Sequence, residues 1–194
     1  AITLIETFSF LRYLGVCAGQ CLLSFDTGPV GVSFSLWARY LGCDKVNVVA
    51  RLDEACARAI DCGRATHVIN NRKASVPESV RAITKEGVHF AIEAIGDNDV
   101  LRDCLDSLAP GGQVGMYGVA PASQGRSPLL DDPRISPAEP CEAMAHEEVM
   151  AQIENGNIPA RAFLTHELDY HECARGFDLL ESREAFKVGL HFSD

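Results

Sequence analysis

The stretch DTGPVG, residues 26–31, directly follows the apolar run CLLSF, residues 21–25. A buried strand, a tight glycine turn and a helix opened by proline form the context in which backbone amides bind the pyrophosphate of a dinucleotide. Gly28 would let the backbone approach that pyrophosphate, and Gly31 would let the helix pack close to the strand. The stretch therefore predicts a cofactor-binding turn made of Asp26, Thr27, Gly28, Pro29, Val30 and Gly31.

The first position of this turn departs from the usual pattern, because Asp26 stands where such turns normally have glycine. Aspartate tolerates unusual backbone dihedrals better than most residues, yet it lacks the freedom of glycine. Its negative charge would also oppose a pyrophosphate. Two expectations follow: a cofactor site of lowered affinity, or a degenerate nucleotide-binding or interaction module without catalysis.

The end of the second predicted strand, residues 45–50, bears on the choice between NAD and NADP. An acidic side chain there would bind the ribose hydroxyls of NAD, but the chain has Ala50 followed by Arg51. Arg51 could hold a 2′-phosphate in a bidentate manner. We therefore predict that the cofactor is NADP, with NAD as the second possibility. The alternative is that Arg51 is a solvated surface charge and does not decide between the two cofactors. A methyltransferase-like use of the turn is disfavoured, since that class usually has an acid where Ala50 stands.

Short apolar runs alternate with helical patterns over the first 119 residues, after a predicted lead-in helix at 1–16. This alternation predicts parallel βαβ units, and right-handed crossovers then give an α/β fold: a doubly wound parallel sheet of the Rossmann type with helices on both faces. The expected strands are 21–25, 45–50, 66–70, 88–95 and 113–119, and the expected helices are 29–42, 52–63, 77–87 and 99–110.

The regular alternation ends at Ala120. The segment 121–140 contains five prolines and is predicted to be a loop with at most one short strand. The predicted domains are a dinucleotide-binding domain over 1–160 and a C-terminal segment over 161–194. Beyond the loop we expect helices at 144–156 and 170–182, and strands at 161–166 and 186–192.

Composition excludes several function classes. The formal net charge is −10 and no basic run is present, so nucleic acid is not an expected partner. No apolar stretch reaches the roughly 18–20 residues that a membrane span needs. The eight cysteines fall mostly in predicted strands and helices, which is typical of buried free thiols in a reducing cytosol. We expect a cytoplasmic protein that acts on a small molecule.

Longer strings along the chain carry a family resemblance. GPVG (28–31), HVIN (67–70), GVHFAIEAIG (87–96) and LAPGGQVGMYGV (108–119) occur in this order, and FLTHELDYHECARGFDLLESREAFKVGLHF (163–192) follows them. Together they resemble the cofactor domain and C-terminal end of the medium-chain dehydrogenase/reductase family, which includes the zinc-type alcohol dehydrogenases. The resemblance implies an NAD(P)-dependent oxidoreductase that transfers a hydride between an alcohol, polyol or carbonyl substrate and the cofactor.

The resemblance also implies roles for single residues outside the glycine turn. Three would lie along the adenosine half of the cofactor, three would approach the nicotinamide, and one would touch the pyrophosphate unless it is an exposed strand charge. In that order they are Ala94, Ile95 and Gly96; Gly118, Val119 and Ala120; and Lys187.

The family's catalytic domain has no counterpart in this chain. That domain carries the zinc-binding motifs and most of the substrate pocket, and the family's third zinc ligand falls near Ala1, which cannot bind a metal. We therefore expect no catalytic residue and no metal ligand in the chain, zinc only in the missing domain, and an isolated chain without activity. Many members of the family pair subunits through a sixth strand, which would fall within residues 121–140 of this chain. A homo-oligomer is therefore a possible assembly.

Overall fold

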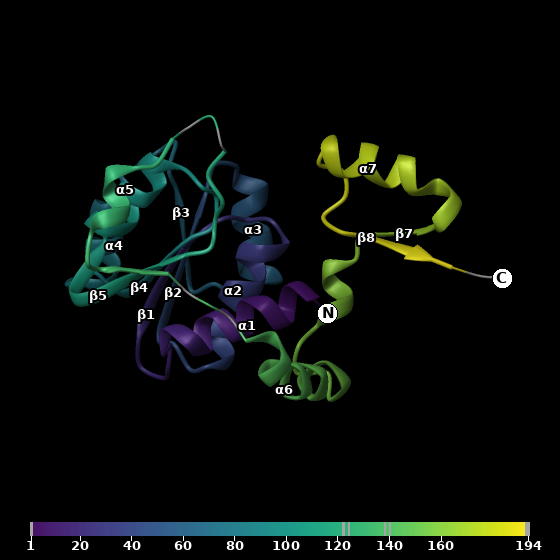
Figure 1. Cartoon of the computed structure of the whole chain (residues 1–194), viewed down its shortest axis with the longest axis horizontal. Coiled ribbons are helices and arrows are strands. Elements are labelled where there is room, and N and C mark those ends of the chain that lie inside the picture. Colours follow the sequence, from purple (N-terminus) through teal and green to yellow (C-terminus); the bar gives the residue numbers. More distant parts are fainter. Residues whose placement is uncertain (1, 122, 124, 138, 140, 193–194) are drawn as a thin grey trace.

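The computed structural model of the chain describes residues 2–121, 123, 125–137, 139 and 141–192. Its main body is a six-stranded sheet with the order β3-β2-β1-β4-β5-β6, and all neighbouring strands run parallel. Helices lie on both sides of this sheet (Figure 1), which confirms the predicted doubly wound fold. The strands are β1 (Cys21–Phe25), β2 (Lys45–Ala50), β3 (His67–Asn70), β4 (Val88–Glu93), β5 (Leu108–Met116) and β6 (Ile135–Pro137).

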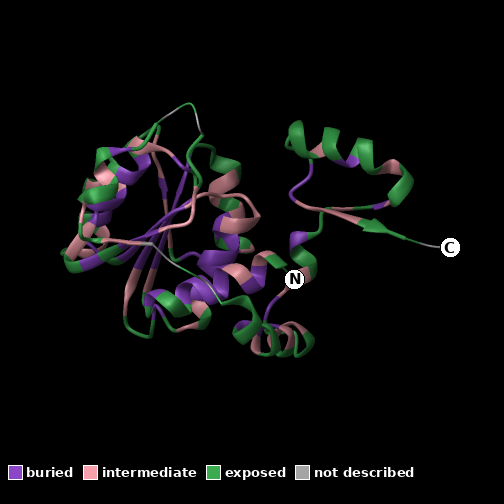
Figure 2. Cartoon of the chain, viewed as in Figure 1, coloured by how far each residue is buried: buried purple, intermediate pink, exposed green. Residues whose placement is uncertain are grey.

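The two faces of the sheet bury separate hydrophobic clusters. Leu22 and Leu23 are neighbours in β1, so their side chains point to opposite faces, and each belongs to a different cluster. The strands are buried between the two helix layers (Figure 2). The Leu22 face is covered by α1 (Ile2–Leu14), α2 (Pro29–Tyr40), α3 (Asp53–Asp61) and α6 (Glu142–Glu154), and the Leu23 face by α4 (Val76–Thr84) and α5 (Asn98–Asp106).

The predicted lead-in helix is α1, and it packs along α2. The rings of Phe8 and Trp37 lie 4.6 Å apart between their centroids. The indole Nε1 of Trp37 donates a hydrogen bond to the carbonyl oxygen of Leu4 at 2.8 Å, and the hydroxyls of Thr7 and Ser33 are 2.6 Å apart. These buried contacts make α1 part of the main body.

The boundary between α5 and β5 differs from the sequence prediction. The helix ends at Asp106 and the strand begins at Leu108, whereas a helix to 110 and a strand from 113 were expected. Pairing with β4 shifts between Val88↔Leu108 and Phe90↔Gln113, so residues 109–112 form an irregular, bulged stretch. A bulge accommodates Pro110, which has no N–H to donate, and the two glycines that follow it. The short strand allowed within 121–140 is β6, next to β5.

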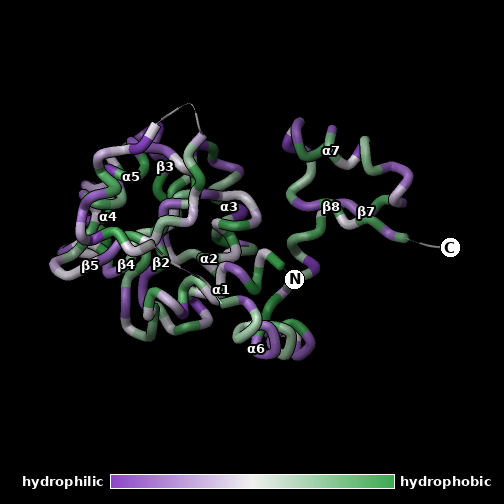
Figure 3. Tube along the Cα trace, in the orientation of Figure 1, coloured by the Kyte–Doolittle hydropathy of each residue, from purple (hydrophilic) through white to green (hydrophobic). Residues whose placement is uncertain are grey.

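The end of the chain forms a small unit apart from the main sheet (Figure 1). It contains β7 (His166–Asp169), α7 (Cys173–Glu181) and β8 (Val188–His191), and β7 pairs with β8 in parallel. Polar and apolar residues are mixed along α7 (Figure 3). The predicted strand at 161–166 is wrong, because a 3₁₀ turn at Ala160–Phe163 brings the ring of Phe163 to 5.9 Å from that of Phe186.

Side chains of this C-terminal unit, among them Phe186 and Lys187, contact the main body. The guanidinium of Arg58 in α3 lies 4.8 Å from the ring centroid of Phe186, a cation–π geometry. The ammonium of Lys187 donates a hydrogen bond to the hydroxyl of Thr3 in α1 at 2.8 Å. Within the described part of the chain, none of the helices has the length and apolar character needed to cross a membrane.

Candidate cofactor-binding site

The glycine turn lies where the direction of the strand order reverses. β1 pairs with β2 on one side and with β4 on the other, and in doubly wound sheets ligands bind at the carboxyl ends of the strands beside such a point. The turn connects β1 to α2, which begins at Pro29. A Cβ placed on Gly31 would lie 2.0 Å from the carbonyl oxygen of Asp26, so only glycine permits this close packing of helix against strand.

The carboxylate of Asp26 folds back onto the start of α2. Its Oδ1 accepts a hydrogen bond from the amide of Gly28 at 2.8 Å, and its Oδ2 accepts one from the amide of Gly31 at 3.0 Å. The described non-glycine residues with positive φ are Arg64, Lys85 and Arg183. Asp26 therefore fits the first position of the turn without the left-handed backbone that would require glycine.

The loops after β4 and β5 meet at the same edge of the sheet. The amides of Tyr117 and Gly118 donate to the carbonyl oxygen of Glu93 at 2.9 and 2.8 Å. A Cβ on Gly96, whose φ is +84°, would lie 2.4 Å from the carbonyl oxygen of Val119. The structure thus brings together the two groups of residues that the resemblance assigned to a cofactor, 94–96 and 118–120.

Glu93 ends β4 and is completely buried. Its Oε1 accepts hydrogen bonds from the amides of Ile95 and Gly96, both at 2.8 Å. Its Oε2 is buried and has no hydrogen-bond partner among the described residues. This carboxylate holds the loop after β4, and the sequence signal for it is an acidic residue that ends an apolar strand shortly before a glycine.

Basic side chains follow β2 and β3. Ala50 is buried and Arg51 is exposed, and the amide of Asn71 donates to the carbonyl oxygen of Ala50 at 3.1 Å, so the loop after β3 lies beside Arg51. The ammonium of Lys73 lies 2.9 Å from the carboxylate of Asp53. That hydrogen bond, together with one from Asn70, lowers the pKa of Asp53.

A contact between α1 and the residue that follows β5 was not predicted from the sequence. The hydroxyl of Tyr117 donates a hydrogen bond to Oε2 of Glu6 at 3.2 Å. Burial, and after it the negative charge of Glu6, raises the pKa of Tyr117 to about 12. No local spacing signals this pair, because its members are 111 positions apart in the chain.

Tyr117 should make the stability of the wild-type chain depend on alkaline pH. A group whose pKa is raised on folding stabilises the protein fully below its unfolded value, near 10, and that contribution is lost as the pH rises through the folded value of about 12. The Tyr117→Phe variant should therefore lose less unfolding free energy between pH 9 and 12. Urea denaturation at both pH values measures the difference, and equal losses in the two proteins would contradict the assignment.

The ammonium of Lys187 donates to Thr3, as described above, and among the described residues it makes no hydrogen bond or ion pair with the glycine turn. Ala1, the position nearest the family's third zinc ligand, lies outside the described residues. Within the described ranges, no group of three or more His, Cys, Asp or Glu side chains is arranged to hold a metal ion.

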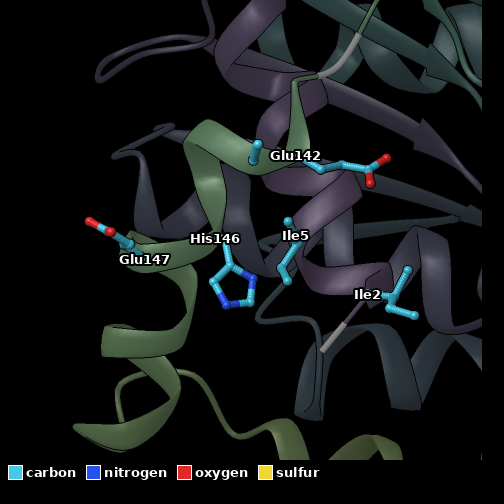
Figure 4. Close-up of a pocket in the computed structure, with 6 residues that line it drawn as sticks. Ile2, Ile5, Glu142, His146 and Glu147 are labelled. Atoms are coloured by element: carbon cyan, nitrogen blue, oxygen red, sulfur yellow. The ribbon is translucent and has the colours of Figure 1, made fainter.

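An open pocket of about 500 Å³ lies elsewhere, between α1 and α6. His146 of α6 points toward Ile5 of α1, whereas Glu147 points away from it (Figure 4). The lining consists of Ile2, Ile5, Glu142, Ala143, His146 and Glu147, and none of these residues belongs to the loops at the carboxyl ends of the strands. The switch-point edge remains the candidate site, because its glycine turn and strand order match a known mode of ligand binding.

Known proteins similar to this chain are dehydrogenases. L-threonine 3-dehydrogenase of Xanthomonas campestris pv. campestris (strain B100) is 28% identical over 193 residues, which cover 91% of this chain and 55% of the relative. Geraniol dehydrogenase of Castellaniella defragrans is 29% identical, with 91% of this chain and 45% of the relative covered. The chain thus spans about half the length of the curated relatives it matches, and those relatives are dehydrogenases.

Solved structures agree with the fold. Alcohol dehydrogenase TADH from Thermus sp. ATN1 superposes with a TM-score of 0.87 at 27% identity, over 98% of this chain and 56% of that one. A zinc-binding dehydrogenase from Sinorhizobium meliloti 1021, solved bound to NADP, gives a TM-score of 0.74 at 19% identity over 92% of this chain and 53% of that one, and this likeness shows the fold alone. A family model described as zinc-binding dehydrogenase matches residues 29–137, more than half of the chain. The chain therefore belongs to the zinc-binding dehydrogenase family, the medium-chain dehydrogenases that the sequence resembles.

Proposed function

We propose that this chain is the nicotinamide-cofactor-binding part of an alcohol dehydrogenase-like oxidoreductase. The observation that carries the proposal is the glycine turn of residues 26–31 at the switch point between β1 and β4, in a sheet with the order β3-β2-β1-β4-β5-β6. This arrangement directs the amino end of α2 toward the ligand-binding edge. The small-molecule alcohol or carbonyl substrate would be selected by residues outside this chain.

The residues present fit a dinucleotide in several respects. The amide of Val30, in the first turn of α2, has no acceptor within the helix and would donate to a phosphate. Gly96 and Gly118 let the loops after β4 and β5 pack backbone to backbone at this edge, since a Cβ on Gly96 would lie 2.4 Å from the carbonyl oxygen of Val119 and one on Gly118 would lie 2.3 Å from the amide nitrogen of Gly96. When bound, a nicotinamide ring would supply the hydride-accepting or hydride-donating carbon. The chain's own task is to hold that ring in a fixed orientation.

NADP is the proposed form of the cofactor. Arg51 is exposed at the end of β2, and Ala50 before it places no carboxylate there to repel a 2′-phosphate. Arg72 and Lys73 follow β3, the neighbouring strand. Because Lys73 is bound to Asp53, Arg51 is better placed than Lys73 to bind a phosphate, and its guanidinium can do so in a bidentate manner.

Titration of the purified chain with NADPH, NADH and S-adenosylmethionine tests both proposals. We expect NADPH to bind, and the Arg51→Ala variant to bind it roughly 10- to 150-fold more weakly, since a hydrogen bond to a charged group contributes about 1.5–3 kcal/mol. NADH affinity should be the same in both proteins. Arg102→Ala, which removes an exposed arginine of α5, is the matched control. An Arg51 variant with unchanged NADPH affinity would remove the argument for NADP.

A second candidate function is a degenerate nucleotide-binding or interaction module without catalysis. The observation that favours it is the carboxylate of Asp26 on the two turn amides that a phosphate would otherwise bind. In the same titration, failure of all three ligands to bind would support this second candidate.

We also propose that residues 161–194 pack against a catalytic domain absent from this chain. The unit of β7, α7 and β8 exposes large apolar side chains, among them Phe177 at 70% and Phe192 at 78%. Exposed apolar surface of this kind marks a site of contact with other protein. Residues 1–160 would then form the cofactor-binding domain.

A further inference from the structure

The position of the Asp26 carboxylate has a direct bearing on cofactor affinity. Both of its oxygens bind backbone amides of the turn, Oδ1 that of Gly28 and Oδ2 that of Gly31. A Cβ built on Gly28 would find those same oxygens at 3.2 and 3.3 Å as its nearest neighbours. The carboxylate therefore covers the surface that Gly28 would leave open for a pyrophosphate.

An anion at this place is strongly held. The amino end of a helix carries a partial positive charge and free N–H groups, and hydrogen bonds to a charged acceptor are about twice as strong as neutral ones. A carboxylate and a phosphate compete for such donors with the same chemistry. The side chain of Asp26 thus provides from within the chain the negative charge that a dinucleotide would bring.

Glu93 supplies an independent observation on the same edge. It pairs in register with Phe25, the residue before Asp26, and it is fully buried with one carboxylate oxygen lacking a partner among the described residues. That oxygen lies beneath Gly118, since a Cβ there would meet it at 2.6 Å. A second acidic group therefore underlies the surface along which the cofactor would lie.

We propose that Asp26 is an internal anion that occupies the pyrophosphate position and must turn away before a dinucleotide binds. This inference rests on the proposed function, because it concerns the same site. It assigns to Asp26 the role of a residue that lowers cofactor affinity while it stabilises the start of α2. The two effects have opposite signs, and this opposition separates the proposal from a purely structural role.

The test uses two substitutions at one position and a matched control. Asp26→Gly removes the carboxylate, and Asp26→Asn removes its charge with little change of shape. Asp97→Asn is the control, because Asp97 also accepts hydrogen bonds from two amides at a helix start, those of Asp99 and Val100 in α5. Calorimetry with NADPH and with inorganic pyrophosphate measures affinity, and thermal unfolding without ligand measures stability.

We expect Asp26→Gly to melt at a lower temperature than the wild type and to bind NADPH and pyrophosphate about 10- to 100-fold more tightly. Asp26→Asn should show a smaller gain in affinity. Asp97→Asn should melt lower without any gain. Tighter pyrophosphate binding by Asp26→Gly, with no NADPH binding by any variant, would support the internal anion and reject the proposed function.

Two results would overturn the inference. One is that the wild type and both Asp26 variants bind NADPH with the same affinity and also bind pyrophosphate with the same affinity. If NADPH binds to these proteins, that result would still agree with the proposed function. The other is a gain in Asp97→Asn as large as that in Asp26→Asn, because the effect would then come from overall charge and not from the position of Asp26.

Discussion

Replacement of Trp37 by alanine is expected to destabilise the chain by about 3–5 kcal/mol, the usual cost of removing a large aromatic side chain from a core. Trp37 has no solvent exposure and its ring lies 4.6 Å from that of Phe8. The substitution also removes the indole hydrogen bond to the carbonyl oxygen of Leu4, which adds to the cost. Because these contacts join α2 to α1, the loss weakens the attachment of the whole lead-in helix.

Urea denaturation followed by circular dichroism measures this effect, provided that the slope with denaturant stays the same. Tyr40→Ala is the control, since Tyr40 lies on the same helix within 5.3 Å of the Trp37 ring but is 40% exposed. Its loss should cost about 1 kcal/mol. If the two variants were destabilised equally, the α1–α2 contact would not be centred on Trp37.

The Gly31→Ala substitution is expected to cost at least about 3 kcal/mol, at the upper end of what overpacking does. The added methyl group would lie 2.0 Å from the carbonyl oxygen and 2.4 Å from the carbonyl carbon of Asp26. Neither atom can move without moving the strand-to-helix connection. The expected result is a lower melting temperature together with loss of any NADPH binding, because the amides at the start of α2 would be displaced.

Gly28→Ala is the control for this second prediction. Its φ of −75° suits any residue, and the three atoms nearest to its added Cβ all belong to the carboxylate of Asp26, the first of them at 3.2 Å. The cost should stay within about 1 kcal/mol. Similar melting temperatures for the two alanine variants would mean that close packing at Gly31 is unimportant for the fold.

Much of the main sheet could be predicted from the sequence, because buried parallel strands are continuous apolar runs bounded by glycine and polar residues. The strands at 21–25 and 45–50 have the bounds that were expected. The prediction failed at Pro110, where local rules favour the end of a helix but pairing with β4 recruits the residues into a bulged strand. It failed again at Phe163, because a short apolar run fits either a strand or a turn.

The candidate site was predicted less completely. The spacing of the turn and the loops after β4 and β5 could be inferred from the order of the motifs. The hydrogen bonds of Asp26 could not, because aspartate in a glycine position suggests either strain or repulsion, and its rotamer depends on how the turn folds around it. The contact between Glu6 and Tyr117 depends on how α1 lies against β5, which no local pattern determines.

The pairing of β7 with β8 leaves both strands as edge strands among the described residues. Each therefore carries, along its outer side, N–H and C=O groups that no neighbouring strand satisfies. A two-stranded sheet is marginal by itself in water, and an open edge is a template for another strand. The C-terminal unit therefore has two open edges, at which another strand could pair in the plane of β7 and β8.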